Sequence, residues 1–386
     1  MKHRWVSRTI NNSIDFFIVV IYFFSYTGTA SLAQVHRAVL QTGETVAVKV
    51  QHKNVRMHSL IDIVSIDFLV SSIARLFPEF SFKWLSEEMR INLPLELDFL
   101  NEGRNCERIQ QIYRKFEWFH TPRIHWDYSS HRVLTMEYME GGHINDRSFI
   151  ESNKIDPLTL TSRLMNLYSD MIFVQGFVHC DPHPGNILVR PSANGPEVVL
   201  LDHGLYSTLN DQFRTCYSHL WYSMINRDLD GIKEWSIRLG AGDLYNLLAC
   251  ILAAKPWSAV SHGLTKIRDP DEQQKERREL KQYAQQYFPN IAQILNRVPR
   301  EMLLILKTND LIRGLETSLG TKDQRMSLIT MSRYCVQAIY AENRSKANWW
   351  ASRIRLNFSE QIVLSKLWIY QWYLRFSAFI YGVRYL

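Results

Sequence analysis

The feature that most constrains the fold is an acidic loop followed by two short apolar segments. Residues 178–189 read VHCDPHPGNILV, and residues 198–204 read VVLLDHG. The two apolar runs are rich in valine and leucine, and the sequence NGP at 194–196 between them is typical of a turn. Short apolar runs bounded by breakers of this kind predict a β-hairpin.

Three polar residues flank this hairpin, namely Asp181, Asn186 and Asp202. We expect their side chains to meet at one end of it. Carboxylate and amide oxygens are ligands for a hard cation such as Mg²⁺. An acid left free of metal could accept a proton or orient a nucleophile. The alternative is a solvated turn between two buried strands, which the joint spacing of the three residues disfavours.

A lysine lies inside an apolar segment upstream of the hairpin. Residues 45–50 read TVAVKV, which predicts a strand whose only charge is Lys49. Such a lysine either snorkels outward or is held for a purpose. Residues 27–33 read TGTASLA, and the small residues of such a loop let the backbone approach phosphate groups closely.

Two acids lie among leucines in the sequence LPLELDFL at 93–100. Because a buried carboxylate needs a partner, we expect Glu96 to pair with Lys49. Glu87 and Glu88 on the preceding predicted helix are alternatives, and an exposed acidic helix face is another. Further along, residues 131–140 read as a strand that runs into Gly141 and the glycine after it, which predicts a hinge.

Composition limits the functional classes. The chain has 386 residues, enough for two lobes with a proper core, and its net charge of +7 is mildly basic. Because the basic residues form no dense stripe, we expect no nucleic-acid partner. The five cysteines are odd in number and form no C-x-x-C pair, which favours a reducing compartment over a disulfide framework or a zinc site.

The two ends of the chain differ from the middle. Residues 1–26 combine a basic start with a nine-residue apolar run, which is too short to span a bilayer. We expect a strand or a spurious start there rather than a signal segment. Residues 344–386 interleave tryptophan and tyrosine with basic residues, which suits an interfacial helix. An aromatic helix packed on its own lobe is the alternative.

The spacing Asp-x4-Asn followed by Asp-x-Gly resembles the catalytic loop and the metal-binding motif of protein kinases. Together with GTAS, LELDFLNEGRN and HCDPHPGN, it resembles the UbiB-like (AarF-domain, ADCK) family of atypical kinases over about residues 27–320. The resemblance implies an α+β, bilobal protein-kinase-like fold, with a small N-lobe sheet with helices and a larger, mostly helical C-lobe. It also implies ATP or ADP with Mg²⁺, a mitochondrial and membrane-associated setting, a membrane lipid surface as partner, and a link to coenzyme Q metabolism.

The resemblance assigns roles to individual residues. Lys49 would hold the nucleotide phosphates, Glu96 would pair with it, and Asp181 would be the catalytic acid/base. Asn186 and Asp202 would bind the metal. Contacts to the nucleotide would come from the small-residue loop and the hinge: Gly28, Thr29, Ala30, Ser31, Glu137, Tyr138 and Met139.

We therefore expect an N-lobe at 27–140, a C-lobe at 141–343 and a tail at 344–386. The predicted function is ATP-dependent phosphoryl transfer or hydrolysis. The family carries a Lys-x-Gly-Gln motif on an N-terminal extension, and no such motif precedes Gly28. This predicts either that the regulatory cover is absent or that the sequence is an incomplete form. It also keeps a nucleotide-binding regulatory pseudokinase as the alternative, and a lipid-binding assembly protein as a weaker one.

Overall fold

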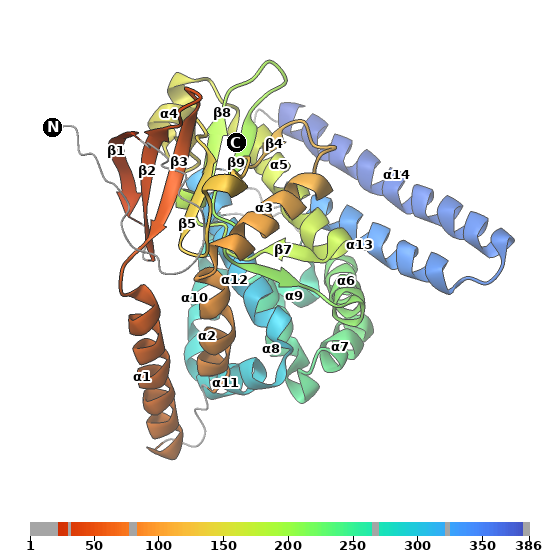
Figure 1. Ribbon diagram of the computed structural model, residues 1–386. Coiled ribbons are helices and arrows are strands. Elements are labelled where there is room, and N and C mark those ends of the chain that lie inside the picture. The colour runs from red at the N-terminus through yellow and green to blue at the C-terminus, as the bar shows by residue number, and fades with distance from the viewer. Residues whose placement is uncertain (1–21, 30–31, 77–82, 265–269, 321–324, 381–386) are drawn as a thin grey trace. The chain divides into compact units, whose positions relative to one another are not determined.

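The computed structural model describes residues 22–29, 32–76, 83–264, 270–320 and 325–380 (Figure 1). The chain divides into two compact units. The first comprises Met1–Phe68, Ser86–His143 and Gly185–Leu205, and the second comprises Leu69–Leu85, Ile144–Pro184 and Tyr206–Leu386. The expectation for the N-terminal segment lies largely outside the described residues, as do the predicted nucleotide contacts of Ala30 and Ser31.

An antiparallel sheet forms the base of the first unit, with the order β1-β2-β3-β5 (Figure 1). Its strands are β1 (Tyr22–Thr29), β2 (Ala33–Val39), β3 (Thr45–Gln51) and β5 (Val133–Glu137). The strand predicted around Lys49 is thus confirmed as β3. Gly28 and Thr29 lie within β1, and not in a loop as the sequence analysis expected; the small-residue segment pairs with β2 after a register shift between Tyr26 and Gly28.

Strand β3 has two buried faces because side chains alternate along a strand. Val46 and Val48 pack into one apolar cluster with Ala38 of the adjacent strand β2 and with Leu40, which directly follows that strand. Ala47 lies against a second cluster, which contains residues of β2, of β5, of the helix α3 (Phe99–Ile112) and of the segment after β4 (Phe119–His120): Ala33, Phe99, Cys106, Ile124, Leu134 and Met136. Lys49 shares the face of Ala47, so its side chain is directed to the side of the sheet that α3 covers.

Three helices accompany this sheet in sequence: α1 (Val55–Leu76), α2 (Lys83–Glu96) and α3 (Phe99–Ile112). Asp98 separates the last two, and its carboxylate accepts a hydrogen bond from the backbone N–H of Leu100. Aspartate is a strong N-cap residue because it satisfies amides that the first helical turn leaves unpaired. The cap fixes where α3 begins and therefore which of its residues face β5.

The predicted hairpin is confirmed as β8 (Ile187–Arg190) and β9 (Glu197–Leu200), which pair antiparallel. They belong to a second sheet with the order β4-β9-β8-β6, together with the short strands β4 (Phe119–His120) and β6 (Gly142–His143). Strand β4 pairs in parallel with β9, and the hairpin belongs to the first unit. The predicted lobe boundaries stay a prediction.

The second unit is mostly helical. In it, β7 (Phe177–His179) pairs antiparallel with β10 (Tyr206–Thr208). Its helices after residue 143 are α4 (Arg147–Ser152), α5 (Pro157–Ser169) with the π-helical continuation Asp170–Gln175, α6 (Asp211–Asn226), α7 (Leu229–Arg238), α8 (Tyr245–Ala253), α9 (Trp257–His262), α10 (Pro270–Gln286), α11 (Phe288–Arg297), α12 (Arg300–Ser318), α13 (Arg325–Lys346) and α14 (Trp350–Ile380).

An aromatic stack lies in the core of the second unit. The Tyr217 ring stacks on Phe173 and on Phe213, with ring centroids 5.7 Å and 5.5 Å apart. Tyr217 and Phe173 are both about 1% exposed, so this stack is part of the interior. A small sheet-based unit and a mostly helical unit together confirm the predicted α+β class.

Candidate active site

Lys49 is buried in the middle of β3. It lies opposite Val35 of β2 and Leu134 of β5, and only 7% of the residue is exposed. Its Nζ lies 5.2 Å from the centroid of the Phe99 ring, within the range of a cation–π contact. A buried ammonium needs oppositely charged partners, since it has lost its hydration.

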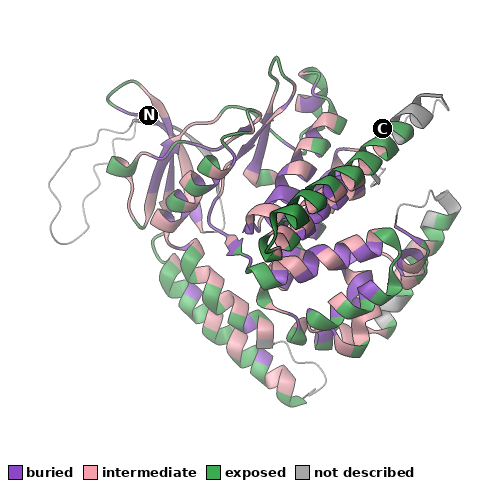
Figure 2. Cartoon of the chain, turned by 90° about the vertical axis from the view of Figure 1, so that its right-hand side faces the viewer, coloured by how far each residue is buried: buried purple, intermediate pink, exposed green. Residues whose placement is uncertain are grey.

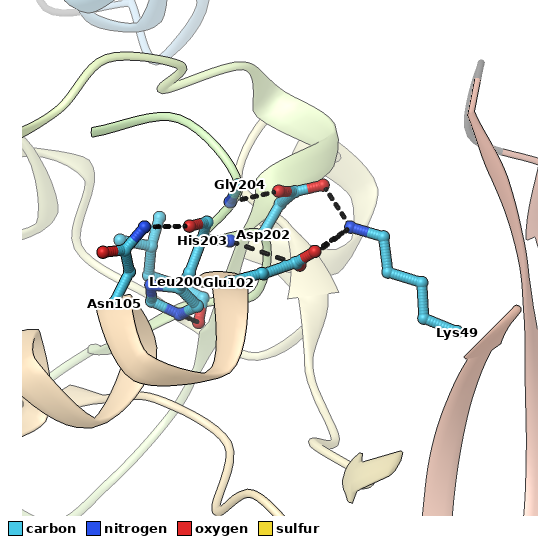
Figure 3. A network of polar contacts seen from close by, with 7 residues as sticks. All are labelled: Lys49, Glu102, Asn105, Leu200, Asp202, His203 and Gly204. Carbon is cyan, nitrogen blue, oxygen red and sulfur yellow. Dashed lines mark hydrogen bonds and ion pairs between the residues drawn. The ribbon is translucent and has the colours of Figure 1, made fainter. Parts of the chain in front are cut away.

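Two carboxylates supply these partners (Figure 3). Lys49 Nζ donates to Glu102 Oε1 at 2.8 Å and to Oε2 at 2.9 Å. It also donates to Asp202 Oδ2 at 2.9 Å. The predicted approach of Lys49 and Asp202, which are 153 residues apart, is therefore confirmed.

The helix glutamate that pairs with Lys49 in the structure is Glu102, whereas the sequence pointed to Glu96, with Glu87 and Glu88 as alternatives. The reason is the helix break at Asp98: Glu96 is the last residue of α2, whereas Glu102 lies in the first turn of α3. Glu96 remains near the site, since a Cβ built on Gly204 would lie 3.9 Å from the Cα of Glu96.

A sequence signal for Glu102 was present. The buried positions of α3 follow helical spacing, and Glu102 is one of them: Phe99, Glu102, Gly103, Cys106 and Ile109. A glutamate on the apolar stripe of a helix must be paired when the stripe is buried. Glu102 is only 1% exposed, so it is the more deeply buried candidate.

Burial and charge shape the electrostatics of this cluster. Burial raises the pKa of Glu102 to about 7, an effect that Lys49 opposes and Asp202 reinforces. Burial by itself lowers the pKa of Lys49, but the carboxylates of Asp202 and Glu102 outweigh it and raise that pKa above its ordinary value. Lys49 thus stays charged, and with both acids ionised the cluster carries a net negative charge that a divalent cation would complement.

The Asp202-His203-Gly204 loop is fastened to α3 (Figure 3). Asp202 Oδ1 accepts a hydrogen bond from the Gly204 N–H at 3.0 Å. Asn105 Nδ2 of α3 donates to the His203 carbonyl at 3.1 Å, and the His203 ring contacts the Leu200 carbonyl through Nε2 at 3.0 Å. His203 is 1% exposed, so it serves as a buried anchor that orients the adjacent Asp202.

Asn186 and Asp202 lie at the same end of the hairpin. Ile187 pairs with Leu200, and the Leu201 N–H donates to the Asn186 carbonyl at 2.9 Å. The side-chain oxygens of an amide and a carboxylate fit the preference of Mg²⁺, which commonly takes one or two carboxylates and completes its shell with phosphates and water. Within the described parts of the chain, no group of three His, Cys, Asp or Glu side chains forms a metal cage.

Asp181 belongs to the second unit, in the loop after β7. Its carbonyl accepts a hydrogen bond from the His183 N–H at 2.7 Å. Its carboxylate Oδ1 accepts from Lys307 Nζ of α12 at 2.9 Å. The sequence motifs do not include Lys307, and this contact joins residues that are 126 positions apart. The expectation that Asp181 meets Asn186 and Asp202 stays a prediction.

The predicted hinge follows β5, which ends at Glu137. Glu137 Oε2 accepts a hydrogen bond from the Arg123 N–H, and Arg37 lies over the Tyr138 ring, with its Cζ 4.7 Å from the centroid. The adenine contacts assigned to residues 137–139, like those of Gly28 and Thr29, stay predictions.

Comparison with known proteins identifies relatives. The family model of the ABC1 atypical kinase-like domain matches residues 23–236. AarF domain-containing protein kinase 1 of Mus musculus is 50% identical over 353 residues, which cover 91% of this chain and 67% of that protein. The AarF domain-containing kinase 1 of Drosophila melanogaster is 50% identical, with coverage of 90% and 67%. A probable serine/threonine-protein kinase of Dictyostelium discoideum is 37% identical, with coverage of 82% and 46%.

Among solved structures, the complex of Rv3197 with erythromycin from Mycobacterium tuberculosis is similar over 56% of this chain and 54% of that chain. Its TM-score is 0.46, and its sequence identity is 22%.

Proposed function

Because this chain belongs to the ABC1 atypical kinase-like family, we propose that it binds ATP or ADP with Mg²⁺ and transfers or hydrolyses the terminal phosphoryl group. The observation that carries the proposal is the buried ammonium of Lys49 between Glu102 and Asp202. A lysine of the sheet paired with a helix glutamate and close to a metal-binding aspartate is the arrangement that kinases require for phosphoryl transfer.

Each residue then has a role. Lys49 neutralises charge on the nucleotide phosphates, and Glu102 holds its ammonium in place. Asn186 and Asp202 would hold Mg²⁺, which supplies charge neutralisation on the phosphate oxygens. Asp181 orients the attacking hydroxyl or water and accepts its proton. Little covalent chemistry is asked of the protein, since positioning and electrostatics account for most of the catalysis in phosphoryl transfer.

The test compares Mg²⁺-ATP binding and ADP release by the wild type, Asp202→Asn and the surface control Asp230→Asn. We expect Asp202→Asn to lose metal-dependent binding and Asp230→Asn, an exposed residue of α7, to match the wild type. Equal metal-dependent binding by all three proteins would rule out the proposed site. Turnover that disappears in Asp181→Asn would separate an enzyme from a nucleotide-binding regulatory scaffold.

We also propose that the protein is mitochondrial, that it works at a membrane lipid surface and that it serves coenzyme Q metabolism. The family resemblance supports the first and last parts. The lipid surface is supported by α14, which is largely exposed in Figure 2. Exposed apolar side chains occur along its whole described length, several of them at helical spacing: Trp350, Ile354, Phe358, Ile362, Trp368, Ile369, Tyr370, Trp372 and Tyr373. Among the described residues, no helix has the length and apolar content needed to cross a bilayer.

A further inference from the structure

A lysine outside the motif residues contacts the proposed acid/base. Lys307 Nζ donates to Asp181 Oδ1 at 2.9 Å, and the two side chains are 49% and 38% exposed. The loop and strand at 177–189, which read FVHCDPHPGNILV, contain no lysine or arginine. A permanent positive charge beside Asp181 is therefore supplied by α12, from a part of the chain far away in sequence.

Helix α12 presents Lys307 from a fixed position. Asn309 Nδ2 donates to the buried Tyr217 hydroxyl at 2.8 Å, and Arg313 Nη1 donates to the Leu252 carbonyl at 2.8 Å. Thr308 is fully buried, and Met302 and other apolar residues of the same face pack inside the second unit. Because Asn309 and Thr308 fix the rotation of the helix about its axis, Lys307 is held on the side that meets Asp181.

The ion pair between Lys307 and Asp181 contributes little to the stability of the fold. Exposed ion pairs contribute little to folding, because water screens them and two long side chains lose freedom. The polar anchors of α12 lie elsewhere, at Asn309 and Arg313. A role in the proposed reaction explains the contact better than a role in folding does. Phosphoryl transfer relies on Lys, Arg or metal charges placed around the reacting groups.

We propose that Lys307 is a positioning residue of the phosphoryl-transfer site. It holds the carboxylate of Asp181 in the orientation needed to meet the attacking oxygen. This inference rests on the proposed function and adds a residue to it that no motif of the sequence includes.

The test uses the full chain and four variants: Lys307→Met, Lys307→Arg, Asp181→Asn and the double variant Lys307→Met/Asp181→Asn. We expect Lys307→Met to lower kcat for ATP hydrolysis roughly tenfold to a hundredfold, the scale of a misplaced catalytic group. The dissociation constant for Mg²⁺-ATP should stay within about twofold of the wild-type value, because Lys49 and Asp202 are untouched. Lys307→Arg should restore most of kcat. Lys233→Met, at an exposed lysine of α7, is the matched control.

The double variant decides whether Lys307 acts through Asp181. If it does, adding Lys307→Met to Asp181→Asn should change kcat by less than about twofold. An unchanged or increased kcat in Lys307→Met, or a full additional loss in the double variant, would overturn the inference. Failure of the proposed function would show differently, as a wild type that neither binds Mg²⁺-ATP nor releases ADP.

Discussion

The Nζ of Lys49 lies 2.8 Å from Oε1 of Glu102, although 53 residues separate them in the chain and both side chains are buried. Two elements must be in place for this contact: β3 must present Lys49 on the face that α3 covers, and α3 must begin at Asp98. The ion pair therefore connects the stability of the first unit to the geometry of the proposed nucleotide site.

Removing the cation should be costly to the fold. Lys49→Met leaves Glu102 buried without its partner, and breaking a buried pair costs about 3–5 kcal/mol of unfolding free energy. Urea unfolding measures this loss, and Lys53→Met, at an exposed residue just after β3, is the control. The double variant Lys49→Met/Glu102→Leu should recover part of the stability, because it also removes the unpaired carboxylate. A double variant as unstable as Lys49→Met would show that the loss does not come from the buried charge of Glu102.

The raised pKa of Glu102 predicts a pH dependence with a definite sign. Between the ordinary glutamate value and about 7, the folded protein binds more protons at Glu102 than the unfolded chain does. Folding stability from this group therefore falls as the pH rises through that window. Relative to Glu102→Gln, the wild type should lose roughly 1–3 kcal/mol between pH 4.5 and pH 7.5. If the unfolding free energies of the two proteins changed equally with pH across this range, the pKa of Glu102 would not be raised.

The cap of α3 should matter for both stability and the site. Asp98 accepts from the Leu100 N–H at 3.1 Å and contacts His131 Nδ1 at 2.8 Å. Asp98→Ala should cost about 1 kcal/mol, whereas Asp98→Asn keeps a capping oxygen and should cost less. Thermal unfolding measures the difference. Weaker Mg²⁺-ATP binding in Asp98→Ala alone would show that the cap sets the position of Glu102. A similar loss of binding in both variants would show instead that the negative charge of Asp98 matters.

The anchor of α12 gives a prediction in the second unit. Asn309→Ala leaves the buried Tyr217 hydroxyl without the amide that donates to it, which should cost about 1–3 kcal/mol. Because the anchor fixes Lys307, kcat should also fall, with Mg²⁺-ATP affinity unchanged. Thr317→Ala, at an exposed position of the same helix, is the control. A stable Asn309→Ala protein with normal kcat would show that α12 is held in other ways.

The exposed face of α14 predicts lipid binding. Trp350→Ser/Trp372→Ser removes two side chains that are 72% and 52% exposed. Since inserting each ring in a membrane interface is worth roughly 1.5–3 kcal/mol, the partition onto vesicles of phosphatidylcholine and cardiolipin should fall at least tenfold. Flotation measures the bound fraction. Phe288→Ser, at an exposed aromatic of α11, should bind like the wild type, and equal flotation of all three proteins would remove the support for a lipid surface.

Several features of the fold and the site could be predicted because their causes are local. Alternating apolar residues around Lys49 indicated β3, and the breakers at 194–196 indicated the hairpin that ends near Asp202. The motif spacing identified the family. The strand predicted over 131–140 was too long, since β5 spans Val133–Glu137 and ends before the glycines.

The choice between acids was less predictable. Glu96 and Glu102 both lie close to leucines in the sequence, and either could have faced Lys49. The helix break at Asp98 put them on different helices, and only the packing of α3 on β5 brought Glu102 to the ammonium. Asp98 as a cap and Glu102 on the buried stripe of α3 were readable in principle, but both depend on where the helix starts, which pattern analysis locates poorly.

The sequence by itself determined which side chains the proposed nucleotide site contains: a lysine in an apolar strand, an aspartate after a hairpin and an acid in a bent loop. These follow from periodicity and turn chemistry over a few neighbouring residues. Only the tertiary structure decided that Glu102 neutralises Lys49 and that Lys307 meets Asp181. The reason is physical, because each of these contacts joins distant segments, and the packing of whole helices and sheets sets which charges come within reach of one another.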